Sequence, residues 1–145
     1  MPQIVVHVGP AGPLLDVLVG VSESRQLALV TTSGTIPGRS QARFLIDTGA
    51  SQTVVDIAII AGLNVRATGV ALVQTASTAD TPQPTPEFDI SLLIPMRSGA
   101  RLFNSVPVFG MSLRPQGIDG LLGRDILAQC LLTYSGPDEI CLFWA

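Results

Sequence analysis

The chain has 145 residues, of which 47% are hydrophobic and only 13% charged, and its formal net charge is -3. This length is typical of one domain, so we expect residues 1–145 to form a single domain with a sizeable core. The low charge density argues against intrinsic disorder. The acidic balance gives no electrostatic reason to expect nucleic acid or an anionic membrane as a partner.

The types of basic residue exclude several kinds of active site. All eight are arginine, so Schiff-base chemistry and a phosphate-binding lysine are excluded. His7 is the only histidine, so one chain cannot build a multi-histidine zinc site, and we expect neither metal nor cofactor. His7 lies in the apolar run 4–8 and is interpreted as an ordinary strand residue. Carboxylate chemistry remains.

Targeting and membrane segments are not evident in the chain. It has no run of about 18 apolar residues, which a membrane-spanning helix requires. The N-terminus lacks a basic region and is interrupted by prolines and glycines, unlike a signal peptide. We therefore expect a cytoplasmic domain without membrane contact, and the sequence leaves open a flanking targeting or membrane segment outside it.

Short β-rich stretches separated by glycine, proline and serine dominate the chain. Strands are expected over residues 4–8, 14–21, 26–31, 42–46, 65–75, 88–95, 102–109, 131–134 and 139–144. Helices are expected over residues 56–61, ended by Gly62, and over residues 124–129. Many short strands with little helix predict an all-β barrel or sandwich-like domain.

The two cysteines, Cys130 and Cys141, both lie in apolar surroundings. A four-residue turn at 135–138 would pair Tyr134 with Glu139 and leave the two cysteines diagonal across the ladder, about 7–8 Å apart. This separation is too large for an unstrained disulfide. We expect two reduced thiols, as is usual in the cytoplasm.

The most informative segment is residues 44–55, Phe-Leu-Ile-Asp-Thr-Gly-Ala-Ser-Gln-Thr-Val-Val. Three apolar residues carry a strand into the core, and Asp47 follows where the strand ends. Thr48 adds a small hydroxyl, and Gly49 permits close backbone approach. A carboxylate at such a turn can point into a cleft while its neighbours supply hydrogen bonds. The tripeptide Asp-Thr-Gly alone, however, is also an ordinary turn.

Two motifs together resemble a known family. Residues 45–55 resemble the active-site loop of aspartic proteases. About seventy residues later, Ile-Asp-Gly-Leu-Leu-Gly-Arg-Asp-Ile-Leu at 118–127 is similar to the segment before the C-terminal helix of retroviral-type proteases. Their order and separation match the single-domain, retropepsin-like family, over roughly residues 14–143. The resemblance implies an all-β closed barrel with one or two short helices, a flap hairpin and a two-fold homodimer.

The resemblance also implies a mechanism with two carboxylates that share a proton and hold a water molecule between them. The chain has one copy of the motif, and Asp119-Gly120, the nearest alternative, is interpreted as a turn. The second carboxylate is therefore expected to be Asp47 of another copy, related by a two-fold axis. The function implied is an endopeptidase acting on peptide or protein substrates.

By resemblance, Thr48 and Gly49 support the active-site loop. The substrate-binding residues implied are Gly49, Ala50, Ser51, Thr75, Ala76 and Ser77. The structural anchors implied are Leu121, Leu122, Gly123 and Arg124, with Arg124 a buried hydrogen-bonding residue. Ser51 departs from retroviral relatives, which often carry an acidic residue there, so Arg124 lacks that ionic partner.

The flap is expected from strands 65–75 and 88–95, with its tip in 76–86. Serine, threonine, aspartate and proline replace the usual glycine-rich tip. Three prolines spaced by two (82, 84 and 86) would place their missing N–H groups along one edge of an extended chain. The segment is interpreted as a flap arm protected on one side or as a disordered loop.

Other readings stay open. The terminal strands 4–8 and 139–144 either form a dimer sheet or cover the monomer's own core. An alternative function is a dimeric protein-interaction module with weak or no catalysis, which the unusual flap tip and Ser51 favour. A small-ligand-binding β-barrel would explain the apolar composition but leaves the two paired motifs as coincidence.

Overall fold

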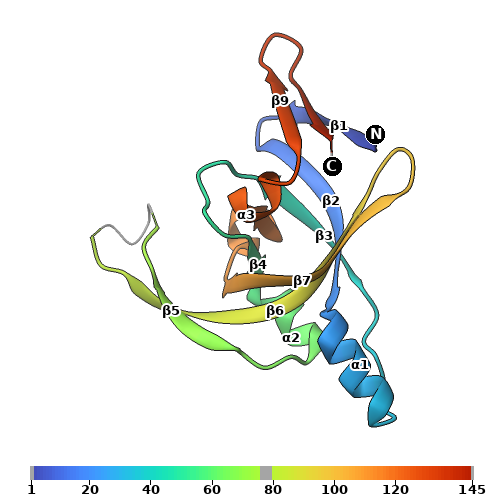
Figure 1. Cartoon of the computed structure of the whole chain (residues 1–145). Coiled ribbons are helices and arrows are strands. Elements are labelled where there is room, and N and C mark those ends of the chain that lie inside the picture. The colour runs from blue at the N-terminus through green and yellow to red at the C-terminus, as the bar shows by residue number, and fades with distance from the viewer. Residues whose placement is uncertain (1, 76–79, 145) are drawn as a thin grey trace.

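The computed structural model describes residues 2–75 and 80–144 (Figure 1). The strands in these ranges are β1 (Gln3–Gly9), β2 (Gly12–Val21), β3 (Ser40–Ile46), β4 (Val54–Asp56), β5 (Gly69–Val73), β6 (Gln83–Pro95), β7 (Ala100–Met111), β8 (Gly120–Leu122), β9 (Leu131–Ser135) and β10 (Ile140–Trp144). The helices are α1 (Glu23–Thr31), α2 (Ile57–Leu63) and α3 (Arg124–Leu127), with a 3-10 turn at Arg114–Gln116.

Six strands close a barrel in the order β2, β3, β8, β4, β7 and β6, and β6 pairs again with β2. β8 lies between β3 and β4, parallel to β3 and antiparallel to β4. The sheet continues past β6 into β5 and past β2 into β1, β10 and β9. The expected all-β closed barrel is confirmed, although the three-residue strands β4 and β8 were not among the expected elements.

The barrel core comes from strand alternation. Along β3 the side chains of Ala42, Phe44 and Ile46 are buried, whereas the residues between them are exposed or half-buried. Phe44 packs so closely over Gly120 of β8 that a side chain at that position would overlap its ring. The strand therefore stays in the core up to Ile46, and the chain emerges at Asp47.

The strand expected over 26–31 is wrong, because this segment belongs to α1. The Ser22 hydroxyl caps the helix by accepting the backbone N–H of Arg25 at 3.3 Å. No residue of α1 is buried, and Leu27 and Val30 are 62% and 61% exposed. A helix that packs on a core has apolar residues every three to four positions, on the face that it buries. Because α1 buries no such face, its sequence did not need this spacing. None of the described helices has the length and apolar character needed to cross a bilayer.

The two expected helices exist with shifted ends. α2 begins after Asp56, whose side chain accepts the N–H of Ala58, and continues through Gly62 to Leu63. Asn64, in the left-handed conformation at φ 53°, ends it instead of Gly62. α3 is a single turn that ends at Leu127, two residues before the expected end.

The terminal strands form a sheet within one chain, in the order β1, β10, β9. Phe143 is fully buried in the main core, so this sheet covers the monomer's own core. The expected hairpin register is wrong: Tyr134 pairs with Cys141, not with Glu139. Glu139 has φ 51° and belongs to the turn, which moves the loop one residue along the chain.

The expected free thiols agree with the structure, but the expected diagonal placement of the two cysteines is wrong, because Cys141 pairs with Tyr134. Cys130 and Cys141 are free thiols, Cys141 fully buried and Cys130 half-buried. Burial raises the pKa of both thiols, and the neighbouring Cys141 raises that of Cys130 further.

The flap arm is a two-stranded ribbon of β5 and the first part of β6, which projects from the barrel in Figure 1. β6 begins at Gln83, so residues 83–86, expected in the tip, lie in a strand. Pro84 and Pro86 face Leu72 and Val70 of β5. Pairing of β6 with β7 starts only at Glu87, so residues 83–86 pair with β5 alone. On the other edge of this stretch, a missing proline N–H costs no hydrogen bond of the sheet.

Candidate active site

Asp47 lies at the end of β3, where the loop of residues 47–53 crosses over β8 to reach β4. Its backbone N–H donates to the carbonyl of Leu122 at 3.0 Å, which ties the loop to β8. Its side-chain Oδ1 accepts the N–H of Gly49 at 2.9 Å, and its carbonyl accepts the N–H of Ala50 at 3.3 Å. Asp47 is therefore held by its own loop in a half-buried position.

The segment after β8 supports this loop from below. The Arg124 guanidinium donates to the carbonyl of Thr48 at 2.9 Å, and its backbone N–H donates to the carbonyl of Ala50 at 2.9 Å. Leu122 is fully buried and Leu121 is half-buried. The structure thus brings the two motifs together, but Arg124 is exposed in the single chain, so the expectation of a buried arginine is wrong.

A second connection joins the end of the loop to α3, and sequence reasoning assigned it no role. The buried hydroxyl of Thr53 donates to Asp125 Oδ1 at 2.8 Å and accepts the N–H of Gly123 at 3.1 Å. Both Asp125 oxygens accept the Thr53 backbone N–H at 3.1 Å. A Cβ on Gly123 would lie 2.7 Å from the carbonyl carbon of Gln52, so only glycine fits. Asp125 and Thr53 both stand in the quoted motifs, but neither motif indicates that the two side chains bind each other.

The start of α2 is fixed by a buried carboxylate. Asp56 is 2% exposed, and its Oδ2 accepts the N–H groups of Leu113 and Arg114, both at 2.8 Å. Burial alone would raise the pKa of the Asp56 carboxyl, but these donors, the Ala58 N–H and the Arg114 guanidinium together hold it below its usual value. Arg114 also lies 3.5 Å from Asp119, whose Oδ2 accepts the backbone N–H of Arg43. This network, with the Asp56 N–H that donates to the carbonyl of Asp119 at 2.8 Å, holds the end of β4 against the start of β8.

The loop presents its remaining groups outward. Thr48, Gly49 and Ser51 are exposed and Ala50 is half-buried. Among the described residues, no hydrogen bond or ion pair reaches the second carboxylate oxygen of Asp47. This oxygen can therefore act on a water molecule or on another group brought to this surface.

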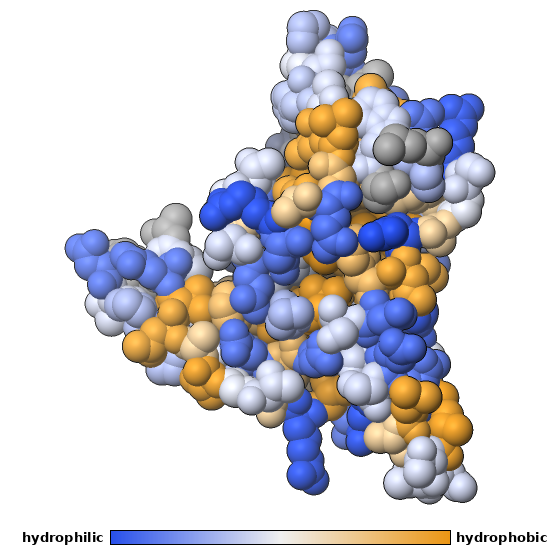
Figure 2. All heavy atoms as spheres, viewed as in Figure 1, coloured by the Kyte–Doolittle hydropathy of each residue, from blue (hydrophilic) through white to orange (hydrophobic). Residues whose placement is uncertain are grey.

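The flap residues could be placed only in part. Thr75 is half-buried just after β5, whereas Ala76 and Ser77 lie outside the described residues. Val70 and Leu72 of β5 are 69% and 73% exposed, and Figure 2 shows apolar atoms along this arm. The arm and the loop between β3 and β4 lie on the same side of the barrel in Figure 1.

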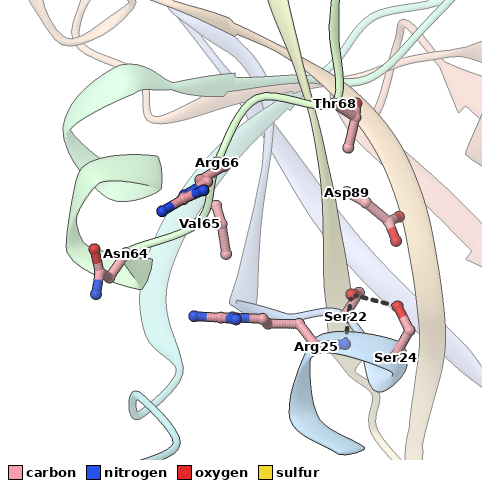
Figure 3. A pocket seen from close by; sticks show the side chains of 8 residues that line it. All are labelled: Ser22, Ser24, Arg25, Asn64, Val65, Arg66, Thr68 and Asp89. Carbon is pink, nitrogen blue, oxygen red and sulfur yellow. Dashed lines mark hydrogen bonds between the residues drawn. The ribbon is translucent and has the colours of Figure 1, made fainter. Parts of the chain in front are cut away.

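An open cleft of about 580 Å³ lies elsewhere, between the start of α1, the end of α2 and β6 (Figure 3). Arg25 and Arg66 border it, and Asp89 lines its β6 side. None of its lining residues comes from the loop 47–53 or from residues 121–124. The cleft is therefore separate from the residues that carry the motifs.

Comparisons with known proteins show the family and the fold of the chain. The family profile described as aspartyl protease matches residues 32–126. Curated proteins give no match. Among solved structures, a retropepsin-like aspartic protease from Rickettsia conorii is similar, with a TM-score of 0.60 and 14% identity over 97% of this chain and 89% of that one. The likeness to that structure concerns the fold, which is retropepsin-like. Since the family profile matches more than half of the chain, the chain belongs to the aspartyl protease family.

Proposed function

We propose that the protein is an endopeptidase in which two Asp47 carboxylates, one from each subunit of a homodimer, activate a water molecule. The observation that carries the proposal is the hydrogen bonding of the Asp47 carboxylate. One oxygen accepts the Gly49 N–H, and the other meets no partner among the described residues. The residues beside it, Thr48 and Gly49, are exposed on the same loop.

A second copy is needed because the other carboxylates near the motifs have structural partners. Asp125 is bound to Thr53, and Asp56 to the backbone at 113–114. Asp119 accepts from the backbone of Arg43. A two-fold axis through the exposed loop would bring two equivalent carboxylates together.

The chemistry follows from two carboxyl groups that share one proton. Two such groups about 3 Å apart do not both ionise, because their negative charges would repel each other. The ionised Asp47 takes a proton from the water as the water oxygen attacks the carbonyl carbon of the peptide bond. The protonated Asp47 donates a hydrogen bond to the carbonyl oxygen. When the tetrahedral intermediate collapses, the carbon–nitrogen bond breaks, and the Asp47 that took the proton from water gives it to the leaving nitrogen.

Substrate would lie between the loop and the flap arm. Gly49, Ala50 and Ser51 would line the loop side of the cleft, and Thr75 with residues 76–77 would close over the peptide. Closure excludes bulk water from the carboxylates. The polar tip and exposed apolar β5 fit an extended peptide, whose backbone and side chains offer both kinds of contact.

Asp47→Asn tests the proposal, and Asp16→Asn is the matched control. The control removes a carboxylate whose side chain is 82% exposed on β2, outside the loop. We expect Asp47→Asn to lower kcat by about a thousandfold or more with an unchanged melting temperature, and Asp16→Asn to leave cleavage unchanged. Adding Asp47→Asn chains to a fixed amount of wild type should also lower activity, because mixed dimers form.

Undiminished cleavage by Asp47→Asn contradicts the proposal. A stable wild-type dimer that cleaves no member of a diverse peptide library would instead favour the alternative function, a dimeric interaction module.

A further inference from the structure

Two arginines without a partner border the open cleft between α1, α2 and β6. In the part of the chain that the structure describes, five arginine side chains each bind a neighbouring group: Arg39, Arg43, Arg101, Arg114 and Arg124. The side chains of Arg25, Arg66 and Arg97 have no hydrogen bond, ion pair or ring contact with any described residue. Two of these three, Arg25 and Arg66, lie at the same cleft. Their charges therefore favour an anion there.

The two guanidinium groups come from different elements and lie toward one end of the cleft. Arg25 stands in the first turn of α1, and Arg66 in the segment between α2 and β5. In Figure 3 both side chains extend toward the end of α2, where Asn64 adds an amide, whereas Asp89 lies on the β6 side. A guanidinium stays charged and offers its N–H groups in a planar fork that matches a phosphate or a carboxylate. Two such groups at one end match a dianion.

The place of Arg25 in its helix also favours an anion. A helix carries a partial positive charge at its N-terminus, so a cation in the first turn is unfavourable. Glu23, the acidic residue of this turn, does not line the cleft. An anion in the cleft would offset both the helix dipole and the Arg25 charge on this side of α1.

The β6 side of the cleft offers acceptors and hydroxyl groups instead of positive charge. Ser105 donates its hydroxyl to Asp89 Oδ1 at 2.7 Å, and the other oxygen of this carboxylate has no partner among the described residues. The Ser22 and Ser24 hydroxyls lie 3.2 Å apart below Asp89 in Figure 3. An ionised carboxylate accepts hydrogen bonds and donates none. The group that meets Asp89 must therefore be a donor, such as a hydroxyl.

The lining and the size of the cleft narrow the class of ligand. Val65 is the one lining side chain without a polar group, and no lining side chain is aromatic. Pockets for apolar or aromatic ligands are lined mainly by apolar and aromatic side chains, so this cleft does not suit them. Its volume of about 580 Å³ is within the range of pockets that hold small organic molecules.

We propose that this cleft binds a small hydroxylated organic phosphate, of the sugar-phosphate class. The phosphate group lies between the Arg25 and Arg66 guanidinium groups, near Asn64. The hydroxyl groups of the ligand donate to the free oxygen of Asp89. The inference goes beyond the proposed function and does not depend on it, because no lining residue belongs to the loop that carries Asp47.

Isothermal titration calorimetry of the full chain at low salt and about pH 7.5 tests this binding, because a phosphate monoester there carries nearly two negative charges. The probes are glucose 6-phosphate and ribose 5-phosphate, with inorganic phosphate and glucose as the two partial ligands. We expect at least one sugar phosphate to bind about tenfold or more tightly than inorganic phosphate, and glucose not to bind. Failure of both sugar phosphates to bind at millimolar concentration would overturn the proposal.

Arg25→Gln and Arg66→Gln locate the site, and Arg97→Gln is the matched control. Arg97 likewise has no side-chain partner among the described residues, but it does not line the cleft. We expect each cleft variant to weaken sugar-phosphate binding about tenfold or more, with an unchanged melting temperature, and Arg97→Gln to bind as the wild type does. An equal loss in all three variants would reveal attraction by net charge alone and would overturn the site.

Asp89→Ala separates the two ends of the ligand. It removes the acceptor for the hydroxyl groups and a negative charge from the cleft. The affinity for the sugar phosphate should therefore fall toward that of inorganic phosphate, and the affinity for inorganic phosphate should not fall. An unchanged affinity for the sugar phosphate, or an equal loss for both probes, would overturn the hydroxyl contact and with it the sugar-phosphate assignment. None of these measurements uses proteolysis, so they stand apart from the test of Asp47.

Discussion

Thr53 and Asp125 are 72 positions apart in the chain, and a hydrogen bond of 2.8 Å joins the Thr53 hydroxyl to the Asp125 carboxylate. Thr53 is fully buried, and its hydroxyl also accepts the Gly123 N–H. One side chain therefore connects the end of the loop 47–53 to both the glycine and the acid of the second motif. This connection fixes the loop that carries Asp47 against the start of α3.

Thr53→Val removes the hydroxyl while keeping the side-chain shape. We expect it to lower the free energy of unfolding by about 2 kcal/mol, because the buried Gly123 N–H loses its acceptor. Thr53→Ser keeps the hydroxyl and should cost less. Denaturant unfolding compares the three proteins. Equal stabilities for the valine variant and wild type would show that the hydroxyl does not support the loop.

Gly123→Ala should be destabilising by about 2 kcal/mol, because the new methyl group meets backbone atoms at 2.7–2.9 Å and neither segment can move freely. Gly62→Ala is the matched control. It lies inside α2 with nothing within 4 Å of the added methyl group, and it should stabilise by about 0.5–1 kcal/mol. Thermal unfolding of both variants tests the difference, and a neutral Gly123→Ala would contradict the close approach.

Asp56 predicts a loss of stability in acid. Its pKa is lower in the folded chain than the ordinary value of 3.8, so the unfolded state takes up the proton first as the pH falls. Its contribution is complete well above pH 3.8 and disappears as the pH falls below 3.8 and through the lowered folded value. Unfolding measured from neutral pH down to about pH 2 should show this loss in the wild type.

Asp56→Asn isolates the effect. At neutral pH we expect the variant to be less stable by about 3 kcal/mol, because an amide cannot accept all the N–H groups that surround this buried carboxylate. The gap between the variant and wild type should narrow in acid. A gap that stays constant across this pH range would show that the charge of Asp56 does not contribute.

Leu72 tests the flap arm. Its side chain is 73% exposed on β5, so Leu72→Ser should leave the free energy of unfolding within about 0.5 kcal/mol of wild type. If the arm closes over peptide, KM should rise while the isolated chain folds normally. Val30→Ser, at a similarly exposed position on α1, should change neither quantity. Unchanged peptide cleavage by Leu72→Ser would argue against contact between this side chain and substrate.

The part of the site that could be predicted from sequence is the part in which backbone geometry dictates residue type. Asp47 follows a buried strand, and Gly123 stands where no side chain fits, so both leave a local pattern. The Thr53–Asp125 bond leaves no such pattern, because it depends on how β8 brings the two motifs together. Arg124 was expected to be buried, but burial of this exposed side chain depends on contacts outside the single chain.

The errors in the fold also have local causes. Residues 26–31 are rich in apolar side chains, which predicted a strand. The structure instead has a helix over this segment, capped by Ser22, in which none of these side chains is buried. The hairpin before β10 moved by one residue because Glu139 adopts a positive φ and joins the turn. In both cases one residue, the helix cap Ser22 or the turn residue Glu139, sets the local structure, and the pattern of apolar residues does not reveal it.

The most direct test of the account counts inhibitor molecules. A statine-type peptide carries a hydroxyl that mimics the attacking water, so it should bind where two Asp47 side chains meet. Native mass spectrometry of the wild-type protein with this inhibitor should show one inhibitor for two chains, and none for Asp47→Asn. One inhibitor for each chain, or binding that persists in Asp47→Asn, would contradict a site shared between two copies.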